Sequence, residues 1–335
     1  MPDPHTTGVS IRGTGVAAFC SAFLLDRAGV AVTLEEFDRP RVPAIMIGEA
    51  SQRLIGDVFE QANVFEGLHR ITKRVVAWGP GVEPKSLPHS AVVISEPQLA
   101  ERLRPSLSGA DASDPSWTIF ASRPLPPVAV ERRFGSRLAR AALVQLKKKS
   151  DPSSCWIESL ENGWLFLIPN SVCEGYLLSV GDVSLDQSRL IAPEIDSAGA
   201  DAAGFPAYPR IIDPLCSGGW LACGTAAMAF DPICGDGTGN AVREAILAAA
   251  VIRADGPIDD RLDHYRMRLL AGFLRHLDQC RQFYSTGHST DWWRAELEEI
   301  RKGIEWCQAQ LGAYREFRYQ LRGFELEPIS PAARV

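Results

Sequence analysis

The first clear pattern of hydrophobic and polar positions predicts a strand, a helix and a second strand within residues 8–36. The first apolar run is GVSI, the small residues after it are RGTGVAA, the amphipathic segment is FCSAFLLDRAG, and the closing run is VAVTLEE. Small residues between an apolar strand and a helix are typical of a tight turn. We therefore expect one compact βαβ unit in this part of the chain.

Later patterns predict further helices, a sheet and a return to the first lobe. Apolar residues recur at helical spacing from Ala50 to Leu68 and from Glu96 to Leu103, with a Pro/Gly-rich stretch between them. Helix-breaking residues from Asp111 to Pro127 indicate a crossing into a second lobe. Short apolar runs from Cys155 to Leu185, separated by Asn, Gly and Pro, are typical of an antiparallel sheet. The strand GGWLACG then precedes an alanine-rich helix from Ala241 to Ala254.

These patterns divide the chain into parts. An α/β lobe takes residues 1–110 and 210–255, and a lobe made mainly of antiparallel sheet takes residues 111–209. Charged helices with spaced aromatic residues take residues 256–335. The sequence therefore predicts an α/β protein with an inserted second lobe.

Composition narrows the classes of protein. Of the 335 residues, 46% are hydrophobic and 23% are charged, as in folded proteins. A net charge of -6 argues against a nucleic-acid partner. The chain lacks an apolar run of the ~18 to 20 residues that would span a membrane, and MPDPHTTG lacks the regions of a signal peptide, so we expect a cytoplasmic protein. Its eight cysteines lack metal-site spacing, so we expect buried thiols and no metal.

The turn in the βαβ unit has the GxGxxA form of a dinucleotide-binding motif. Gly13 permits the tight turn, Gly15 lets the backbone approach a pyrophosphate, and Ala18 lets the helix and strand pack closely. The residues between them, Val16 and Ala17, begin the helix, whose N-terminus attracts phosphate.

An acidic residue at the end of the second strand completes this motif. Glu36 stands 23 residues after Gly13 and can accept hydrogen bonds from ribose hydroxyls, and Glu35 is its near rival. Alone, such a turn is also compatible with a purely structural role, but the strand, helix and acid together favour a dinucleotide.

A second glycine-rich segment lies about two hundred residues later, GTAAMAFDPICGDGTGNAVREA. Its glycines free the backbone to contact a flat ring, and the helix that follows can point N–H groups at a ligand. Pro232 has one fixed backbone dihedral angle and restricts Asp231 to extended conformations, which shapes how this segment approaches a ligand. The candidate cofactor-binding residues here are Thr225, Asp231, Pro232, Gly235, Asp236, Gly237, Thr238, Gly239 and Asn240. The alternative is a plain turn before a packing helix.

Three blocks resemble the flavin-dependent halogenases and related monooxygenases. They are Glu36–Ala50 with its ending Ile-Gly-Glu-Ala, Gly163–Pro169, and Gly224–Gly239, and the family has serine at the position of Ala50. The resemblance implies FAD, held in a Rossmann-like lobe of the glutathione reductase type with an inserted antiparallel-sheet substrate lobe and C-terminal helices. Thr225 replaces the family's acid, so Asp236 is an alternative contact for the ribityl chain.

The resemblance leaves the reaction open. Halogenases rely on a lysine after the Gly-Glu-Ser block, and Lys73 matches that lysine poorly. Ala229–Pro232 is similar to non-halogenating relatives that mature quinone cofactors by oxidising a tryptophan in a partner polypeptide. We therefore favour an FAD-dependent monooxygenase that hydroxylates an aromatic, or peptidyl tryptophan, substrate through a flavin hydroperoxide. His69 and His89 are weak candidates for a proton donor, since histidine has a suitable pKa but is usually structural.

Further residues are candidate contacts of the substrate or the cofactor. The substrate candidates are Glu49 and three aromatic residues that are equally compatible with core packing, Trp78, Trp164 and Phe166. Arg53 either meets the flavin phosphate or lies on a solvated face.

Two other classes of protein remain as alternatives. One is a degenerate flavoprotein fold that binds a partner without catalysis, suggested by Ala50 and Thr225. The other is a flavin-dependent halogenase or reductase. Because the chain has no second GxGxxG unit, we expect electrons to come from a separate flavin reductase or from transiently bound nicotinamide.

Overall fold

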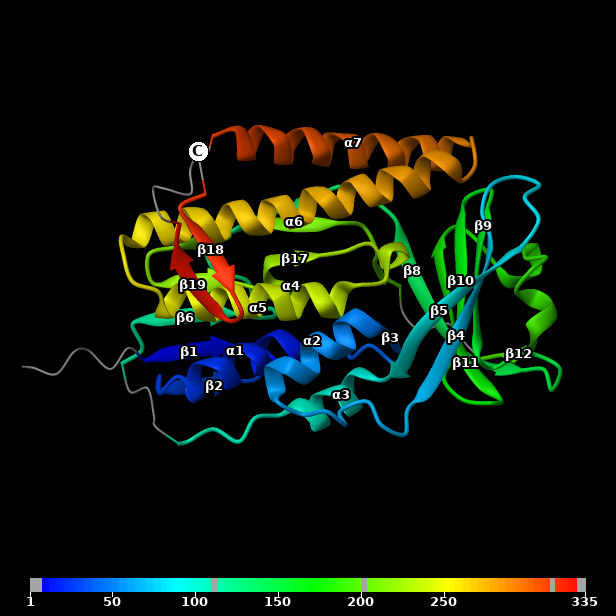
Figure 1. Ribbon diagram of the computed structural model, residues 1–335. Coiled ribbons are helices and arrows are strands. Elements are labelled where there is room, and N and C mark those ends of the chain that lie inside the picture. Colours follow the sequence, from blue (N-terminus) through cyan, green and yellow to red (C-terminus); the bar gives the residue numbers. More distant parts are fainter. Residues whose placement is uncertain (1–7, 110–113, 200–203, 314–316, 330–335) are drawn as a thin grey trace, which may run out of the picture.

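A computed structural model describes residues 8–109, 114–199, 204–313 and 317–329, and these form two sheet-based lobes beside a pair of long helices (Figure 1). The lobe with the βαβ unit lies at one end of the molecule and the larger sheet at the other. The predicted α/β class is confirmed. The first residues of the predicted lobe crossing, 111–113, lie outside the described part of the chain.

A five-stranded sheet forms the centre of the first lobe, in the order β15-β16-β6-β1-β2. All neighbouring pairs except β15 with β16 are parallel, as crossover connections through helices require. Its strands are β1 (Val9–Arg12), β2 (Val32–Glu35), β6 (Trp117–Phe120), β15 (Cys216–Ser217) and β16 (Trp220–Ala222). The predicted βαβ unit is therefore present, with α1 (Val16–Arg27) as its helix.

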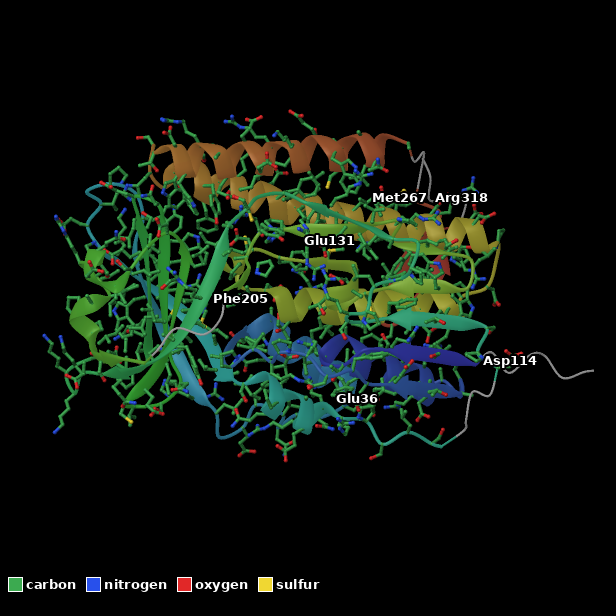
Figure 2. The ribbon with its side chains drawn as sticks, turned by 180° about the vertical axis from the view of Figure 1, so that it is seen from behind. Glu36, Asp114, Glu131, Phe205, Met267 and Arg318 are labelled. Atoms are coloured by element: carbon green, nitrogen blue, oxygen red, sulfur yellow. The ribbon has the colours of Figure 1, made fainter. Side chains whose placement is uncertain are left out.

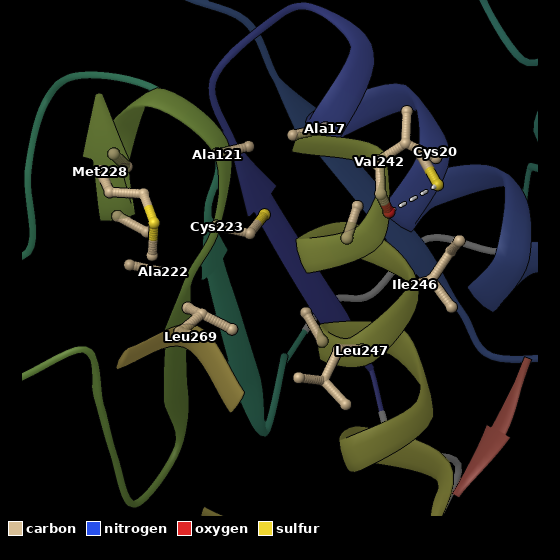
Figure 3. Packing of buried hydrophobic residues seen from close by; sticks show 14 of the residues in the cluster. Ala17, Cys20, Ala121, Ala222, Cys223, Met228, Val242, Ile246, Leu247 and Leu269 are labelled. Atoms are coloured by element: carbon tan, nitrogen blue, oxygen red, sulfur yellow. Dashed lines mark hydrogen bonds between the residues drawn. The ribbon is translucent and has the colours of Figure 1, made fainter. Parts of the chain in front are cut away.

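Helix α5 (Gly237–Arg253) packs against α1, although more than two hundred residues separate them in the chain. Small residues allow the close packing: Ala17 and Cys20 of α1 face Val242 and Ile246 of α5 (Figure 3). The Cys20 thiol also donates to the backbone oxygen of Val242 over 3.9 Å. This contact brings the second glycine-rich segment to the dinucleotide turn.

Nine strands form the larger sheet, in the order β12-β8-β11-β10-β9-β4-β5-β3 with β13 paired to β8. The strands are β3 (Ile45–Gly48), β4 (His69–Ala77), β5 (Lys85–Ile94), β8 (Leu138–Leu146), β9 (Ser154–Leu160), β10 (Gly163–Pro169), β11 (Glu174–Gly181), β12 (Ile195–Ala198) and β13 (Phe205–Pro206). Neighbouring strands are antiparallel except β4 and β9. The antiparallel sheet predicted for residues 155–185 is therefore present.

Part of this sheet comes from a region predicted to belong to the first lobe. Strands β3, β4 and β5 lie within residues 1–110, and two of them occupy the stretch expected only to be rich in Pro and Gly. The reason is that β4 pairs with β9, which lies almost eighty residues later. The larger sheet therefore combines strands from two of the predicted sequence ranges, residues 1–110 and 111–209.

Helix boundaries differ from prediction where local backbone geometry decides them. Helix α3 (Glu96–Leu103) has the predicted bounds because Ser95 and Gln98 form a capping box. Helix α2 (Glu49–Phe59) is shorter than predicted. It ends because Glu60 adopts a left-handed conformation with φ of 53°.

The remaining elements connect or cover the lobes. A three-stranded sheet has the order β17-β14-β7, and a hairpin joins β18 to β19. These elements are β7 (Val130–Arg133), β14 (Arg210–Asp213), β17 (Met228–Ala229), β18 (Tyr319–Arg322), β19 (Glu325–Pro328), α4 (Gly224–Ala227), and the short 3₁₀ turns η1 (Leu185–Gln187), η2 (Ala192–Glu194) and η3 (Pro232–Cys234). The predicted helical tail thus ends in a hairpin.

Helices α6 (Ile258–Thr286) and α7 (Asp291–Gly312) pack against each other along one side of the molecule (Figure 1). Two of their aromatic residues, Tyr284 and Trp293, are almost fully buried, and Trp293 packs edge-on against Trp78. Within the described residues, no helix is both long and apolar enough to cross a membrane.

Candidate functional site

Cavity 1, of about 320 Å³, lies between α1, α5 and the loop that joins β17 to α5. The dinucleotide turn contributes Thr14 to Ala17, and the second segment contributes Thr225, Gly235, Gly237 and Thr238 to its lining. Asp231 and Pro232 line the same cavity. The structure therefore brings the two glycine-rich segments together around one space.

Both helices that point into cavity 1 begin without a side-chain cap. The N-cap residues, Gly15 of α1 and Asp236 of α5, make no side-chain hydrogen bond to the first turn, and neither first turn contains an acidic residue. Uncapped N–H groups and the positive end of the helix dipole favour an anion. The cavity is therefore suited to a negatively charged group.

Two glycines allow close contacts between the segments around cavity 1. Gly13 has φ of +128°, and a Cβ there would lie 2.5 Å from the backbone nitrogen of Ser122. Gly224 has φ of +54°, and its Cβ would lie 2.7 Å from the Cβ of Ala17. Side chains rarely adopt such φ values, and these contacts leave no space for one. Gly13 is thus required by its contact with Ser122, just after β6, while Ala18 of α1 is fully buried.

The two candidate ribose acids differ in their partners. Glu36, on the first lobe in Figure 2, accepts hydrogen bonds from Arg104 and, over 3.3 Å, from the Thr14 hydroxyl. The Arg104 guanidinium holds the pKa of Glu36 below its ordinary value. Glu35 instead pairs with Arg12 at 2.9 Å. Glu36 is therefore the acid linked to the dinucleotide turn through Thr14.

The sequence did not predict two charged residues that line cavity 1, Arg39 and Glu96. Arg39 and the buried Glu96 form an ion pair that lines the cavity, and Glu96 also accepts from the Val42 N–H over 2.9 Å. Arg41 donates to the Thr14 hydroxyl over 3.2 Å. The only signal in the sequence was the arginine pair in the DRPR run after the second strand.

Cavity 2, of about 360 Å³, adjoins cavity 1 because Gly235 lines both. Its other walls come from β3, β4, β5, α2 and the glycine-rich loop. The lining includes Glu49, Ala50, Ser51, Arg74, His89, Ser90, Cys234 and Asp236. Of the candidate substrate residues, Glu49 is the one that lines this cavity.

Of the weak catalytic candidates, His89 lines cavity 2, whereas Lys73 and His69 line neither cavity. Burial and the neighbouring Arg74 lower the pKa of His89, so its imidazole is neutral near pH 7. Lys73 is exposed on β4 and pairs with Asp151 at 3.3 Å. His69 contacts the Pro152 carbonyl oxygen at 2.7 Å.

Of the aromatic candidates, Trp164 and Phe166 lie in the core, and Trp78 is partly buried against it. Trp164 is fully buried and donates to the Tyr284 hydroxyl over 3.2 Å, and Phe166 is 6% exposed within the same cluster. Trp78 donates to the Phe283 backbone oxygen over 2.9 Å. None of these three aromatic residues lines cavity 1 or cavity 2.

Buried charges fix the loop that contributes to the lining of both cavities. The Asp231 carboxylate accepts from the Ile233 N–H, the Tyr284 hydroxyl and Arg137 at 2.8–2.9 Å. Arg137 is fully buried and also pairs with Glu296 of α7. Burial alone would lower the pKa of Arg137, but Tyr284 and the two carboxylates raise it overall. Asp231 therefore anchors the loop to the C-terminal helices.

Other predicted cofactor residues make structural contacts. The Asp236 carboxylate accepts from the Ser51 hydroxyl over 2.6 Å and from Arg243 over 2.8 Å, and Asn240 also contacts Arg243. Gly239 is buried where a Cβ would overlap Ser51. Arg53 is exposed, pairs with Glu49, and lines neither cavity.

Glu244 of α5 is a buried acid that lines cavity 1 and was not predicted. It accepts a hydrogen bond from the Gly224 N–H over 2.7 Å, and burial raises its pKa to about 8. The unfolded chain keeps the ordinary value near 4.5, so stability is lost as the pH rises from 4.5 through 8.

We expect Glu244→Gln to remove this pH dependence, because glutamine can still accept from Gly224 but never ionises. Thermal unfolding without cofactor would show equal stability near pH 4.5 and a variant that is more stable by a few kcal/mol at pH 8.5, since each pKa unit is worth ~1.4 kcal/mol. The control is Glu298→Gln, which changes an exposed side chain on α7, and its stability should depend on pH as that of the wild type does. Parallel pH profiles for wild type and Glu244→Gln would contradict the burial argument.

Comparison with solved structures identifies the class of fold. The chain has the α/β fold of FAD-binding flavoprotein halogenases and hydroxylases, so the resemblance predicted from the sequence is confirmed at the level of the fold. No family model and no curated protein matches the sequence.

Three solved structures illustrate the similarity. The peptidyl tryptophan dihydroxylase QhpG, described as essential for tryptophylquinone cofactor biogenesis, shares 18% identity, with 86% of this chain and 78% of QhpG covered and a TM-score of 0.69. The flavin-dependent halogenase CmlS shares 17% identity over 91% of this chain and 71% of CmlS, with a TM-score of 0.74. HpxO of Klebsiella pneumoniae, complexed with FAD and uric acid, shares 14% identity over 91% of this chain and 96% of HpxO, with a TM-score of 0.63.

Proposed function

We propose that this protein is an FAD-dependent monooxygenase that hydroxylates an aromatic substrate. The observation that carries the proposal is the lining of one cavity by two glycine-rich segments that lie far apart in the chain. Among proteins of the same fold, QhpG is a peptidyl tryptophan dihydroxylase and HpxO is complexed with FAD and uric acid. These names supply the substrate class: an aromatic small molecule or a tryptophan within a partner polypeptide.

The residues around cavity 1 fit FAD. The uncapped N-termini of α1 and α5 offer N–H groups to phosphate and to ring carbonyls. A Cβ at Gly235 or Gly237 would meet nothing within 4 Å, so the loop leaves room for a ligand beside it. Glu36, held next to the turn by Thr14, is placed to accept from ribose hydroxyls.

Bound FAD would supply the redox chemistry with oxygen, and the chain would position the reactants. Cavity 2 adjoins cavity 1 at Gly235 and is our proposed substrate space. Its His89 accepts a hydrogen bond from Arg74 at Nε2 over 3.3 Å, so the Nδ1–H of this imidazole can donate a hydrogen bond to a substrate, and burial together with Arg74 keeps the ring uncharged. We further propose a separate flavin reductase as the electron source.

The test is a reaction of purified protein with FAD, a flavin reductase, nicotinamide, oxygen and two substrate sets: small aromatic compounds and tryptophan-containing peptides. We expect flavin absorbance in the protein fraction and product that carries one oxygen atom from labelled O₂. His89→Ala should reduce turnover without loss of bound flavin. Absence of both flavin binding and thermal stabilisation by FAD would refute the proposal and favour a non-catalytic fold.

Halogenation is less well supported because Lys73 is exposed and paired with Asp151. Chloride and bromide are included in the same reactions. We expect no halogenated product and no effect of Lys73→Met on hydroxylation. A halogenated product that disappears in Lys73→Met would replace hydroxylation as the proposed reaction.

A further inference from the structure

Two cysteines from distant parts of the chain meet at the wall of cavity 2. Cys234 ends η3, and Cys280 lies in α6. Their Sγ atoms are 3.7 Å apart, within van der Waals contact. Cys234 is half-buried and lines the cavity, whereas Cys280 is fully buried behind it. A small molecule in cavity 2 can therefore reach the first sulfur and not the second.

The two thiols differ in acidity in a way that gives each a role. The Cys280 thiol donates a hydrogen bond to Cys234 and lowers the pKa of Cys234 to about 6, with a further contribution from His276. Burial raises the pKa of Cys280 well above its ordinary value. Near neutral pH, Cys234 is thus the thiolate and nucleophile, and Cys280 keeps its proton.

His276 lies beside the pair, and its hydrogen bond argues against a metal site. The donor atoms of Cys234, His276 and Cys280 lie within 4.8 Å of one another, a grouping that a metal could use. The Asp231 N–H, however, donates to His276 Nε2 over 2.9 Å. That bond occupies the lone pair through which the imidazole would bind a metal. Chemistry between the two sulfurs is therefore the better fit.

We propose that Cys234 and Cys280 form a modification site at which a small hydroperoxide converts the pair to a disulfide. The Cys234 thiolate attacks the peroxide, the O–O bond breaks, and Cys234 becomes a sulfenic acid with release of hydroxide. The Cys280 sulfur then displaces the hydroxyl group from Cys234, and its proton leaves with that group as water. The two cysteines supply two electrons, and hydrogen peroxide is reduced to the equivalent of two waters.

Oxidation would change the loop beside both cavities. Bond formation requires the sulfurs to move closer than their present 3.7 Å, and Cys234 is joined directly to Gly235, which lines both cavities. Disulfide formation would therefore draw this part of the loop toward α6. The inference depends only on the two thiols and does not require bound flavin.

The experiment uses the full, reduced chain treated with stoichiometric hydrogen peroxide at neutral pH. We expect the loss of two titratable thiols and a peptide map that links the segments containing Cys234 and Cys280. In Cys234→Ser, oxidation of Cys280 should be at least about tenfold slower. In Cys280→Ser and Cys280→Ala, Cys234 should stop at a sulfenic acid that dimedone traps.

Cys173→Ser is the matched control, because Cys173 is exposed, directly precedes β11 and lines neither cavity. This variant should form the disulfide at the wild-type rate. A peptide map of treated wild-type protein in which Cys234 and Cys280 remain reduced would overturn the proposal whether or not the variants fold. Stoichiometric zinc that protects both thiols from peroxide would also overturn it, in favour of a metal site.

Discussion

We expect Arg137→Met to lower the free energy of unfolding by about 3–5 kcal/mol, the usual cost of removing one partner from a buried ion pair. Arg137 is fully buried between Asp231 at 2.7 Å and Glu296, so the variant leaves two carboxylates without their shared cation. The methionine retains part of the apolar stem but cannot replace the charge. Denaturant unfolding of wild type and variant, without cofactor, measures the difference.

The control for this prediction is Arg294→Met, which removes an exposed partner of Asp291 on α7. Pairs of this kind contribute little, so a change within about 1 kcal/mol is expected. Adding Asp231→Asn and Glu296→Gln to Arg137→Met should restore part of the lost stability, because it removes the unpaired charges. An Arg137→Met protein as stable as the Arg294→Met control would show that the buried charges are compensated elsewhere.

The second large effect is expected on the affinity of the protein for FAD. We expect Gly237→Leu to weaken FAD binding at least about 100-fold, which corresponds to ~2.7 kcal/mol, while the protein stays folded. Gly237 is the first residue of α5 and lines cavity 1, and a Cβ there meets nothing within 4 Å. The added side chain therefore extends into cavity 1 and occupies space that we assign to FAD. Flavin fluorescence titration measures the affinity, and thermal unfolding without FAD measures the fold.

Gly218→Leu is a matched control. Gly218 also has an open Cβ direction, but it lies in the turn between β15 and β16 and lines neither cavity. This variant should bind FAD with wild-type affinity. If Gly237→Leu bound FAD as tightly as the control, the cofactor would have to lie elsewhere than beside the start of α5.

The sequence was most informative where function depends on the backbone. The dinucleotide turn was predicted from Gly13, Gly15 and Ala18 because a turn and a close packing contact leave a local signature. The second segment was predicted on similar grounds, and both segments line cavity 1. The fold class followed from these segments and from the short apolar runs, separated by Asn, Gly and Pro, that predicted the antiparallel sheet.

Contacts between distant side chains were not predictable. The Arg39–Glu96 pair, buried Glu244 and the Cys234–Cys280 contact each join elements that only the folded chain brings together. The pairing of β4 with β9 likewise has no local pattern, so residues 1–110 were predicted to belong to the first lobe although β3, β4 and β5 pair within the larger sheet. Trp164 was ambiguous for a related reason, since an aromatic residue looks the same in a core and in a pocket.

The anchoring of Asp231 also has a consequence for the order of events during synthesis. Its partners include Arg137, which is made earlier, and Tyr284, which is made later, and Arg137 is in turn balanced by Glu296 of α7. The buried contacts that hold the loop beside cavity 1 can therefore all form only after the start of α7, with Glu296, has left the ribosome. Loading of a nucleotide cofactor would then be a late event, completed on a nearly finished polypeptide.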